Sequence, residues 1–86
     1  MDIYRNTNSL SNIPVPLEWL GAILVTARKE RNLSQGQLAD LLGAHQSVVA
    51  RWETEGYRSV NLERLVQVAE ALEFEISLWP KPKSKI

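Results

Sequence analysis

The sequence predicts an all-α domain of four helices that ends in one C-terminal strand. Apolar residues recur every three or four positions through most of residues 16–73, which is the spacing that gathers side chains on one face of a helix. Residues 74–79 instead alternate between apolar and polar side chains, which is the period of a strand. The chain has 86 residues and no cysteine, so we expect one small domain that helix packing or oligomerisation stabilises.

The first helix is predicted to begin at Pro16, because proline suits the first turn of a helix, and to end near Arg31. Its apolar stripe comprises Leu17, Leu20, Leu24 and Ala27, with Ile23 and Trp19 on the flanks. Residues 1–15 are polar and show no periodicity, so we expect a largely disordered N-terminal arm.

Residues 34–53 predict two short helices joined by a tight turn. Ser34 is a suitable N-cap, and Gln37 completes a capping box three residues later. Gly43 permits the left-handed turn that ends this helix, and the next one is expected to start near His45. The core-facing residues are expected to be Leu38, Leu41 and Leu42, then Val49 and Trp52. This is helix-turn-helix geometry, in which the second helix is shaped to enter a DNA major groove.

The last helix and the strand complete the predicted domain, which spans residues 16–73 before the strand at 74–79. Asn61 caps a helix whose expected stripe is Leu62, Leu65, Val66, Ala69 and Leu72. No other segment predicts a strand, and an unpaired strand is unstable, so its partner should come from a second copy of the protein. The predicted homodimer interface comprises Phe74, Ile76, Leu78 and Trp79. Residues 80–86 form a short basic tail that we expect to be flexible.

Charge and composition exclude several classes of function. The net charge is zero, but five bases lie between residues 28 and 58, and residues 62–79 hold four acids against one base. A modestly basic face backed by an acidic one therefore predicts weak non-specific DNA binding. His45 is the only histidine, so we expect no metal, no cofactor and no enzymatic activity. Without a long apolar run or a signal peptide, the expected location is the cytoplasm, with no membrane partner.

A family resemblance extends from about Leu20 to Leu72. It rests on Leu33, Ser34, Gln35, Leu38, Ala39, Leu42, Gly43, Gln46, Ser47, Val49, Arg51, Trp52 and Glu53 at fixed spacing. This run resembles the Cro and phage-repressor type of helix-turn-helix domain, and the strand that follows makes it most similar to HipB-type antitoxins. The resemblance implies a homodimeric repressor that binds double-stranded operator DNA, represses its own operon and acts as antitoxin to a HipA-like kinase toxin. A two-fold dimer presents two recognition helices about 34 Å apart, so the operator should be an inverted repeat.

The chemistry of individual side chains predicts which residues of such a dimer contact the DNA. Gln46 suits adenine, Arg51 suits guanine, Ser47 accepts either, and Ala50 can touch a thymine methyl group. Gln35 is expected at a phosphate, because it opens a helix whose N–H groups favour anions. Tyr57, Arg58 and Ser59 are further predicted phosphate ligands, and His45 is predicted to be a substitute cap or a phosphate neighbour. The resemblance also implies that Arg28 pairs with Glu53, behind the reading face.

Two alternatives remain open from the sequence. One is a phage-type repressor or restriction-modification controller that has no toxin partner. The other is a protein-interaction module that has lost DNA binding, which the zero net charge favours and the presence of Gln35, Gln46 and Arg51 opposes.

Overall fold

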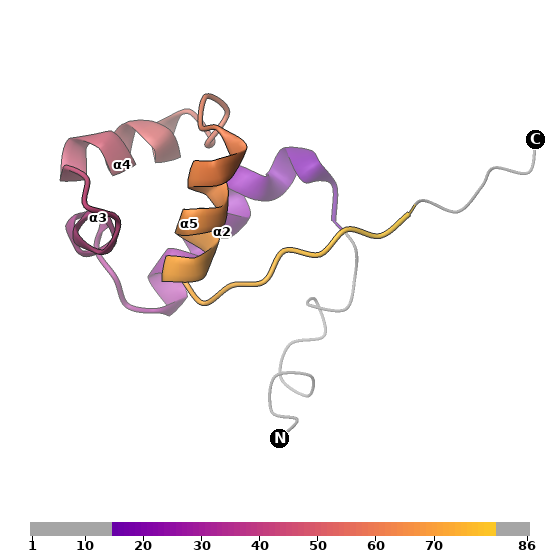
Figure 1. Cartoon of the computed structure of the whole chain (residues 1–86), viewed down its shortest axis with the longest axis horizontal. Helices are drawn as coiled ribbons and strands as arrows, with labels where there is room; N and C mark the ends of the chain where they lie inside the picture. Colours follow the sequence, from indigo (N-terminus) through magenta and orange to yellow (C-terminus); the bar gives the residue numbers. More distant parts are fainter. Residues whose placement is uncertain (1–14, 81–86) are drawn as a thin grey trace, which may run out of the picture.

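The computed structural model describes residues 15–80, and the four expected α-helices lie within them (Figure 1). A 3₁₀ turn, η2 (Leu17–Trp19), precedes α2 (Leu20–Glu30), α3 (Gln35–Leu42), α4 (Gln46–Thr54) and α5 (Leu62–Ala71). Helices α3 and α4 pack together at one end of the molecule, and α5 packs against α3 (Figure 1). The predicted N-terminal arm falls almost wholly outside the described residues, as does most of the basic tail.

The first helical segment begins with a 3₁₀ turn. Pro16 is the N-cap of η2, and its carbonyl oxygen accepts a hydrogen bond of 3.0 Å from the Trp19 N–H. The α-helix therefore starts at Leu20, later than the periodicity predicted. Leu17 is 71 % exposed, so its predicted place in the core stripe is wrong: the tighter turn places it outside the face that Leu24 and Ala27 bury.

The turn between α3 and α4 follows the predicted capping chemistry. The Ser34 hydroxyl accepts from the Gln37 N–H at 3.0 Å, and the Gln37 side chain accepts from the Ser34 N–H at 2.8 Å. Gly43 adopts the left-handed conformation with φ of 67° and ends α3. His45 is the N-cap of α4 but its side chain makes no capping hydrogen bond, so its predicted role as a substitute cap is wrong.

The core lies where the four helices meet. Its fully buried side chains are Leu24, Leu38, Val49, Val68 and Leu72, with Ala27, Ala39, Trp52 and Tyr57 beside them. The expected stripe of α5 is wrong in part, because Leu62 and Val66 are 75 % and 47 % exposed whereas Val68 is fully buried. Val66 lies about 200° around the helix from Val68, so both cannot face the same core. On α3, Leu41 is 60 % exposed and also points away from the core.

Beyond α5 the chain leaves the domain in an irregular segment (Figure 1). Phe74 is half-buried against the core, whereas Ile76, Leu78 and Trp79 are 42 %, 88 % and 71 % exposed. Within residues 15–80 there is no strand, because a ladder needs a partner and the single described chain offers none. Pairing of residues 74–79 across a dimer stays a prediction.

None of the helices in the described part of the chain has the length and apolar character needed to cross a membrane.

Candidate nucleic-acid interface

Helix α4 presents a polar face on the side opposite its core contacts. Gln46, Ser47 and Arg51 are exposed, and Ala50 beside them is half-buried. Val49 and Trp52 are 0 % and 7 % exposed and anchor the opposite side of the helix in the core. The predicted base-contacting residues therefore share one surface, which we call the reading face (Gln46, Ser47, Ala50 and Arg51).

Gln35 connects the reading face to the interior. The Gln46 side-chain amide donates to Oε1 of Gln35 at 2.8 Å, and the Gln35 amide donates in turn to Oε1 of Glu53 at 2.9 Å. One Gln46 N–H is thereby used, and the second N–H and the carbonyl oxygen stay available to a ligand. Because Gln35 is itself the first residue of α3, the two helices of the motif hold the Gln46 amide in a defined orientation.

A nearly buried ion pair lies at the inner end of this connection. Arg28 donates through Nε to Oε2 of Glu53 at 2.7 Å and through Nη2 to Oε1 at 3.0 Å. Its Nη1 donates to the Leu33 carbonyl oxygen at 2.7 Å. The two side chains are 9 % and 8 % exposed, so this pair joins α2 to α4 with little contact with bulk water.

The protonation of this pair follows from its contacts. The hydrogen bond to Glu53 raises the pKa of the Arg28 guanidinium above its ordinary value, against the opposing effect of burial. Burial alone would raise the pKa of the Glu53 carboxyl, but hydrogen bonds from Arg28 and Gln35 outweigh it, so the net pKa is lowered. Both groups are charged at neutral pH, as the sequence resemblance implied.

In the loop after α4, the position of Tyr57 does not fit its predicted role as a phosphate ligand. This residue adopts a positive φ of 60° and its side chain is 3 % exposed, with its ring centroid 6.1 Å from that of Trp52. The hydroxyl is buried with no hydrogen-bond partner among the described residues, and this desolvation raises the pKa of Tyr57 to about 12. The prediction that Tyr57 is a phosphate ligand is wrong, because its side chain is buried in the core and cannot present its hydroxyl to DNA.

The neighbouring residues of that loop are exposed. Arg58 lies at the surface, where a phosphate can reach it. The Ser59 hydroxyl donates to Oε1 of Glu55 at 2.6 Å, so its one donor is already used, next to a negative charge. Of the two, Arg58 is the better placed for a phosphate.

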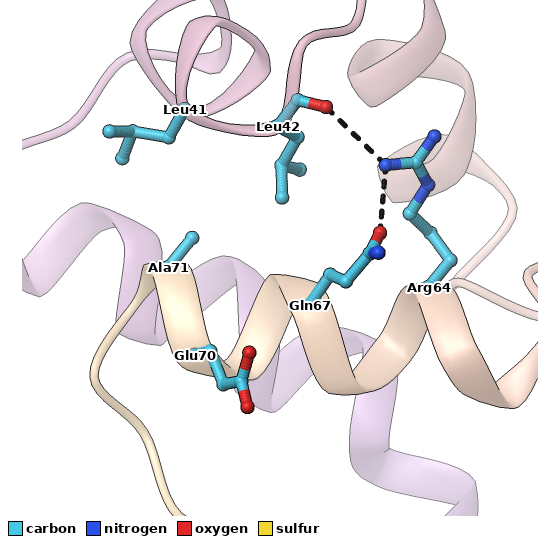
Figure 2. A pocket seen from close by; sticks show the side chains of 6 residues that line it. All are labelled: Leu41, Leu42, Arg64, Gln67, Glu70 and Ala71. Atoms are coloured by element: carbon cyan, nitrogen blue, oxygen red, sulfur yellow. Dashed lines mark hydrogen bonds between the residues drawn. The ribbon is translucent and has the colours of Figure 1, made fainter.

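Arg64 is a structural residue that the sequence did not single out. Its guanidinium lies 5.4 Å from the centroid of the Trp52 ring, and Nη1 donates to Oε1 of Gln67 at 2.9 Å and to the Leu42 carbonyl oxygen at 3.4 Å. Figure 2 shows this fork between α3 and α5, beside a shallow hollow that Leu41 and Ala71 also line. Arg64 thus satisfies one of the last carbonyl groups of α3 and holds α5 against the helix-turn-helix unit.

A group of three or more His, Cys, Asp or Glu side chains that could hold a metal ion is not found among residues 15–80.

The sequence model of the helix-turn-helix family matches residues 24–79, which is more than half of the chain. The chain therefore belongs to the helix-turn-helix family, of the Cro and phage-repressor type. Members of this class are DNA-binding transcription regulators, and this protein is one of them. A comparison with curated individual proteins gave no match.

Proposed function

We propose that the protein is a homodimeric repressor that recognises an inverted-repeat operator through the reading face of α4, and that it serves as antitoxin to a HipA-like kinase toxin. The observation that carries the DNA-binding part is the Gln35–Gln46 hydrogen bond. This hydrogen bond orients the Gln46 amide on an exposed helix face before any ligand binds, and leaves its second N–H and its carbonyl oxygen available.

The length of the reading face along α4 matches a few base pairs of DNA. Its residues lie on neighbouring turns from Gln46 to Arg51, which span about 7–8 Å along the helix at 1.5 Å per residue. That length covers two or three neighbouring base pairs. An amide suits the N6 and N7 atoms of adenine and a guanidinium suits the O6 and N7 atoms of guanine, so we assign the former to Gln46 and the latter to Arg51.

Backbone contacts would come from the residues at the edges of the motif. Gln35 begins α3, where N–H groups without a helical partner and the positive end of the helix dipole favour a phosphate. Arg58 lies in the loop beyond α4, and His45 is exposed just before α4. Together these positions flank the reading face on both sides, which fixes register without adding base preference.

Dimerisation is proposed through residues 74–79. Ile76, Leu78 and Trp79 are exposed apolar side chains in a segment whose backbone has no ladder partner in the described chain. Antiparallel pairing with a second copy would satisfy those backbone groups and cover the apolar side chains together. The two-fold axis would then place two α4 helices on successive faces of the major groove.

The antitoxin role rests on the resemblance of residues 72–79 to HipB-type proteins. A set of acidic side chains outside the reading face supports it, because Glu63, Glu70, Glu73 and Glu75 are exposed on and just after α5 and could meet a protein partner. A phage-type repressor or restriction-modification controller would share the fold and the reading face but bind no kinase.

Binding titrations on a selected operator and on a scrambled duplex test the DNA-binding part. The Arg51→Ala variant is expected to lose about 1–3 kcal/mol per half-site on the operator and to relax the preference at one base pair. The Arg58→Ala variant should instead weaken both duplexes alike and flatten the salt dependence. Equal losses on the two duplexes for Arg51→Ala would reduce Arg51 to a phosphate contact.

Co-purification with the products of neighbouring genes tests the antitoxin part. A kinase-like protein that binds the dimer, and whose activity the dimer suppresses, is the expected result. If specific operator binding is found but no such kinase is bound or encoded nearby, the protein is a repressor without a toxin partner.

A further inference from the structure

The end of α5 is held by a side chain from the end of α2. Arg31, which caps α2, donates through Nε to the Leu72 carbonyl oxygen at 2.9 Å and through Nη2 to the Glu73 carbonyl oxygen at 3.0 Å. Its Nη1 also lies 3.0 Å from Oε1 of Glu73. A guanidinium presents its donors in one rigid plane, so three such contacts fix an angle as well as a distance.

The backbone at this point is shaped to turn sharply. Glu73 adopts a left-handed φ of 54°, which a residue other than glycine rarely does. The Phe74 N–H donates to the Ala69 carbonyl oxygen at 2.8 Å, which closes the helix end in the manner of a Schellman motif. Phe74 then packs half-buried against the core. The direction in which the following residues leave the domain is therefore set at three successive residues, Leu72, Glu73 and Phe74.

That direction matters because a small change of angle at residue 74 is converted into a large displacement at residue 79. Residues 74–79, once extended, reach about 17 Å at 3.3 Å per residue. A change of about 10° where the segment leaves the domain moves its far end by about 3 Å, by the same geometry. One base pair adds about 3.4 Å along DNA, so an error of this size is comparable to one base pair of half-site spacing.

We propose that the Arg31–Glu73 contact is a clamp that sets the angle between the DNA-binding domain and the dimerising segment, and thereby the half-site spacing that the dimer accepts. This inference rests on the proposed dimer. Arg31 is a positioning residue in it: it acts on DNA through the orientation of the two domains. The side-chain exposures of 42 % and 74 % for Arg31 and Glu73 place the clamp at the surface, so its loss should leave the core intact.

The test measures spacing preference in the full-length protein. Affinities are determined for operators whose two half-sites are separated by the preferred spacer and by spacers one or two base pairs shorter or longer, and the dimer dissociation constant is measured by sedimentation. The variants are Arg31→Ala, Arg31→Lys and Glu73→Gln. Lys29→Ala is the matched control, because it removes one positive charge from the same exposed end of α2 without touching the clamp.

For Arg31→Ala the preference for the native spacer is expected to fall by about tenfold, because a loosened link no longer matches both half-sites at one distance. Binding to an isolated half-site should stay unchanged. Arg31→Lys keeps the charge but not the forked donors, so it should resemble Arg31→Ala. Glu73→Gln, which removes only the carboxylate contact, should show a smaller loss.

Three outcomes would overturn the inference. The first is a spacing preference in Arg31→Ala equal to that in Lys29→Ala. The second is a uniform loss of affinity on every spacer and on the half-site, which would mark Arg31 as a residue of general stability. The third is a wild-type protein that stays monomeric on and off DNA, which removes the proposed dimer as well. A wild-type dimer that binds no specific DNA would refute the proposed function together with the spacing effect, whereas the first two outcomes refute the clamp and leave the proposed function standing.

Discussion

Four hydrogen-bonded side chains connect the interior of the protein to the exposed face of α4. Arg28, Glu53, Gln35 and Gln46 form a continuous set of hydrogen bonds between 2.7 and 3.0 Å long. Glu53 occupies the middle of that set, so it is not merely a partner of Arg28 behind the reading face. A change at Glu53 is therefore expected to alter both the stability of the fold and the order of the Gln46 amide.

Replacing Glu53 with Gln tests that double role. The change leaves Arg28 without its counter-charge in a part-buried position, so the free energy of unfolding should fall, by less than the roughly 3–5 kcal/mol that breaking a fully buried pair costs. Operator affinity should fall as well, because Gln35 no longer has a carboxylate to hold it. Urea unfolding and operator titration measure the two effects, with Glu55→Gln as the control, since Glu55 is exposed and, among residues 15–80, its carboxylate accepts a hydrogen bond from Ser59 alone.

The effect of Glu53→Gln on the free energy of unfolding is expected to depend on pH. The pKa of Glu53 is lowered in the folded protein relative to its ordinary 4.5, so its charge stabilises the fold fully above that pH. The contribution is lost as the pH falls below 4.5 and through the lowered pKa of the folded state. The difference in unfolding free energy between wild type and Glu53→Gln should therefore shrink on acidification below pH 4.5. A constant difference down to pH 3 or so would contradict the pairing.

At the scale of elements, backbone contacts decide how closely the helices approach. A Cβ atom built on Gly21 of α2 would overlap the Gly56 carbonyl group, in the turn after α4. Gly56 has a positive φ of 67°, and the Tyr57 beside it enters the core. Helix α2 therefore packs directly against the backbone of the loop that follows α4.

Gly21→Ala is expected to destabilise the protein by about 2 kcal/mol, because the new methyl group meets backbone that cannot move aside freely. Gly36→Ala is the matched control within another helix. Its Cβ would meet nothing closer than 3.8 Å, so it should raise stability by about 0.5–1 kcal/mol through helix propensity alone. Thermal unfolding of both variants gives the comparison, and equal shifts of the same sign would show that the approach of Gly21 to Gly56 is unimportant.

At the scale of the whole molecule, the described chain leaves an apolar segment uncovered. Ile76, Leu78 and Trp79 follow a half-buried Phe74 and contribute little to the core of their own chain. Exposed apolar side chains gathered in one segment support the proposal that this segment is the dimer interface.

Ile76→Pro is expected to convert the proposed dimer into monomers, because proline removes a backbone donor and disfavours a paired strand. Ile76→Val keeps the donor and the β-branched shape, so it should stay dimeric. Sedimentation at micromolar concentration distinguishes the two, and thermal unfolding of a dilute sample verifies that the proline variant remains folded. Wild-type dimerisation in Ile76→Pro would move the interface elsewhere, for instance to the exposed Leu62 and Val66 of α5.

The sequence alone determined the local features of this protein. The Ser34–Gln37 capping box, the left-handed Gly43, the Asn61 cap and the inward Val49 and Trp52 all depend on residues no more than a few positions apart. Such features follow from hydrogen bonds and dihedral preferences that operate along one turn of chain, so their residue types predict them directly. The Arg28–Glu53 pair came from the resemblance, which carried a long-range contact that spacing cannot show.

The tertiary structure decided which apolar residues are buried and how the polar ones connect. Leu62 and Val66 match a helical period as well as Val68 does, but only the position of α3 and α2 selects the side of α5 that faces the core. Tyr57 lies in a loop that its neighbours make polar, yet its ring is buried in the core beside Trp52. The clamp of Arg31 on Leu72 and Glu73 joins residues about 40 positions apart, where rotation of whole helices, and not any local preference, determines which donor meets which carbonyl group.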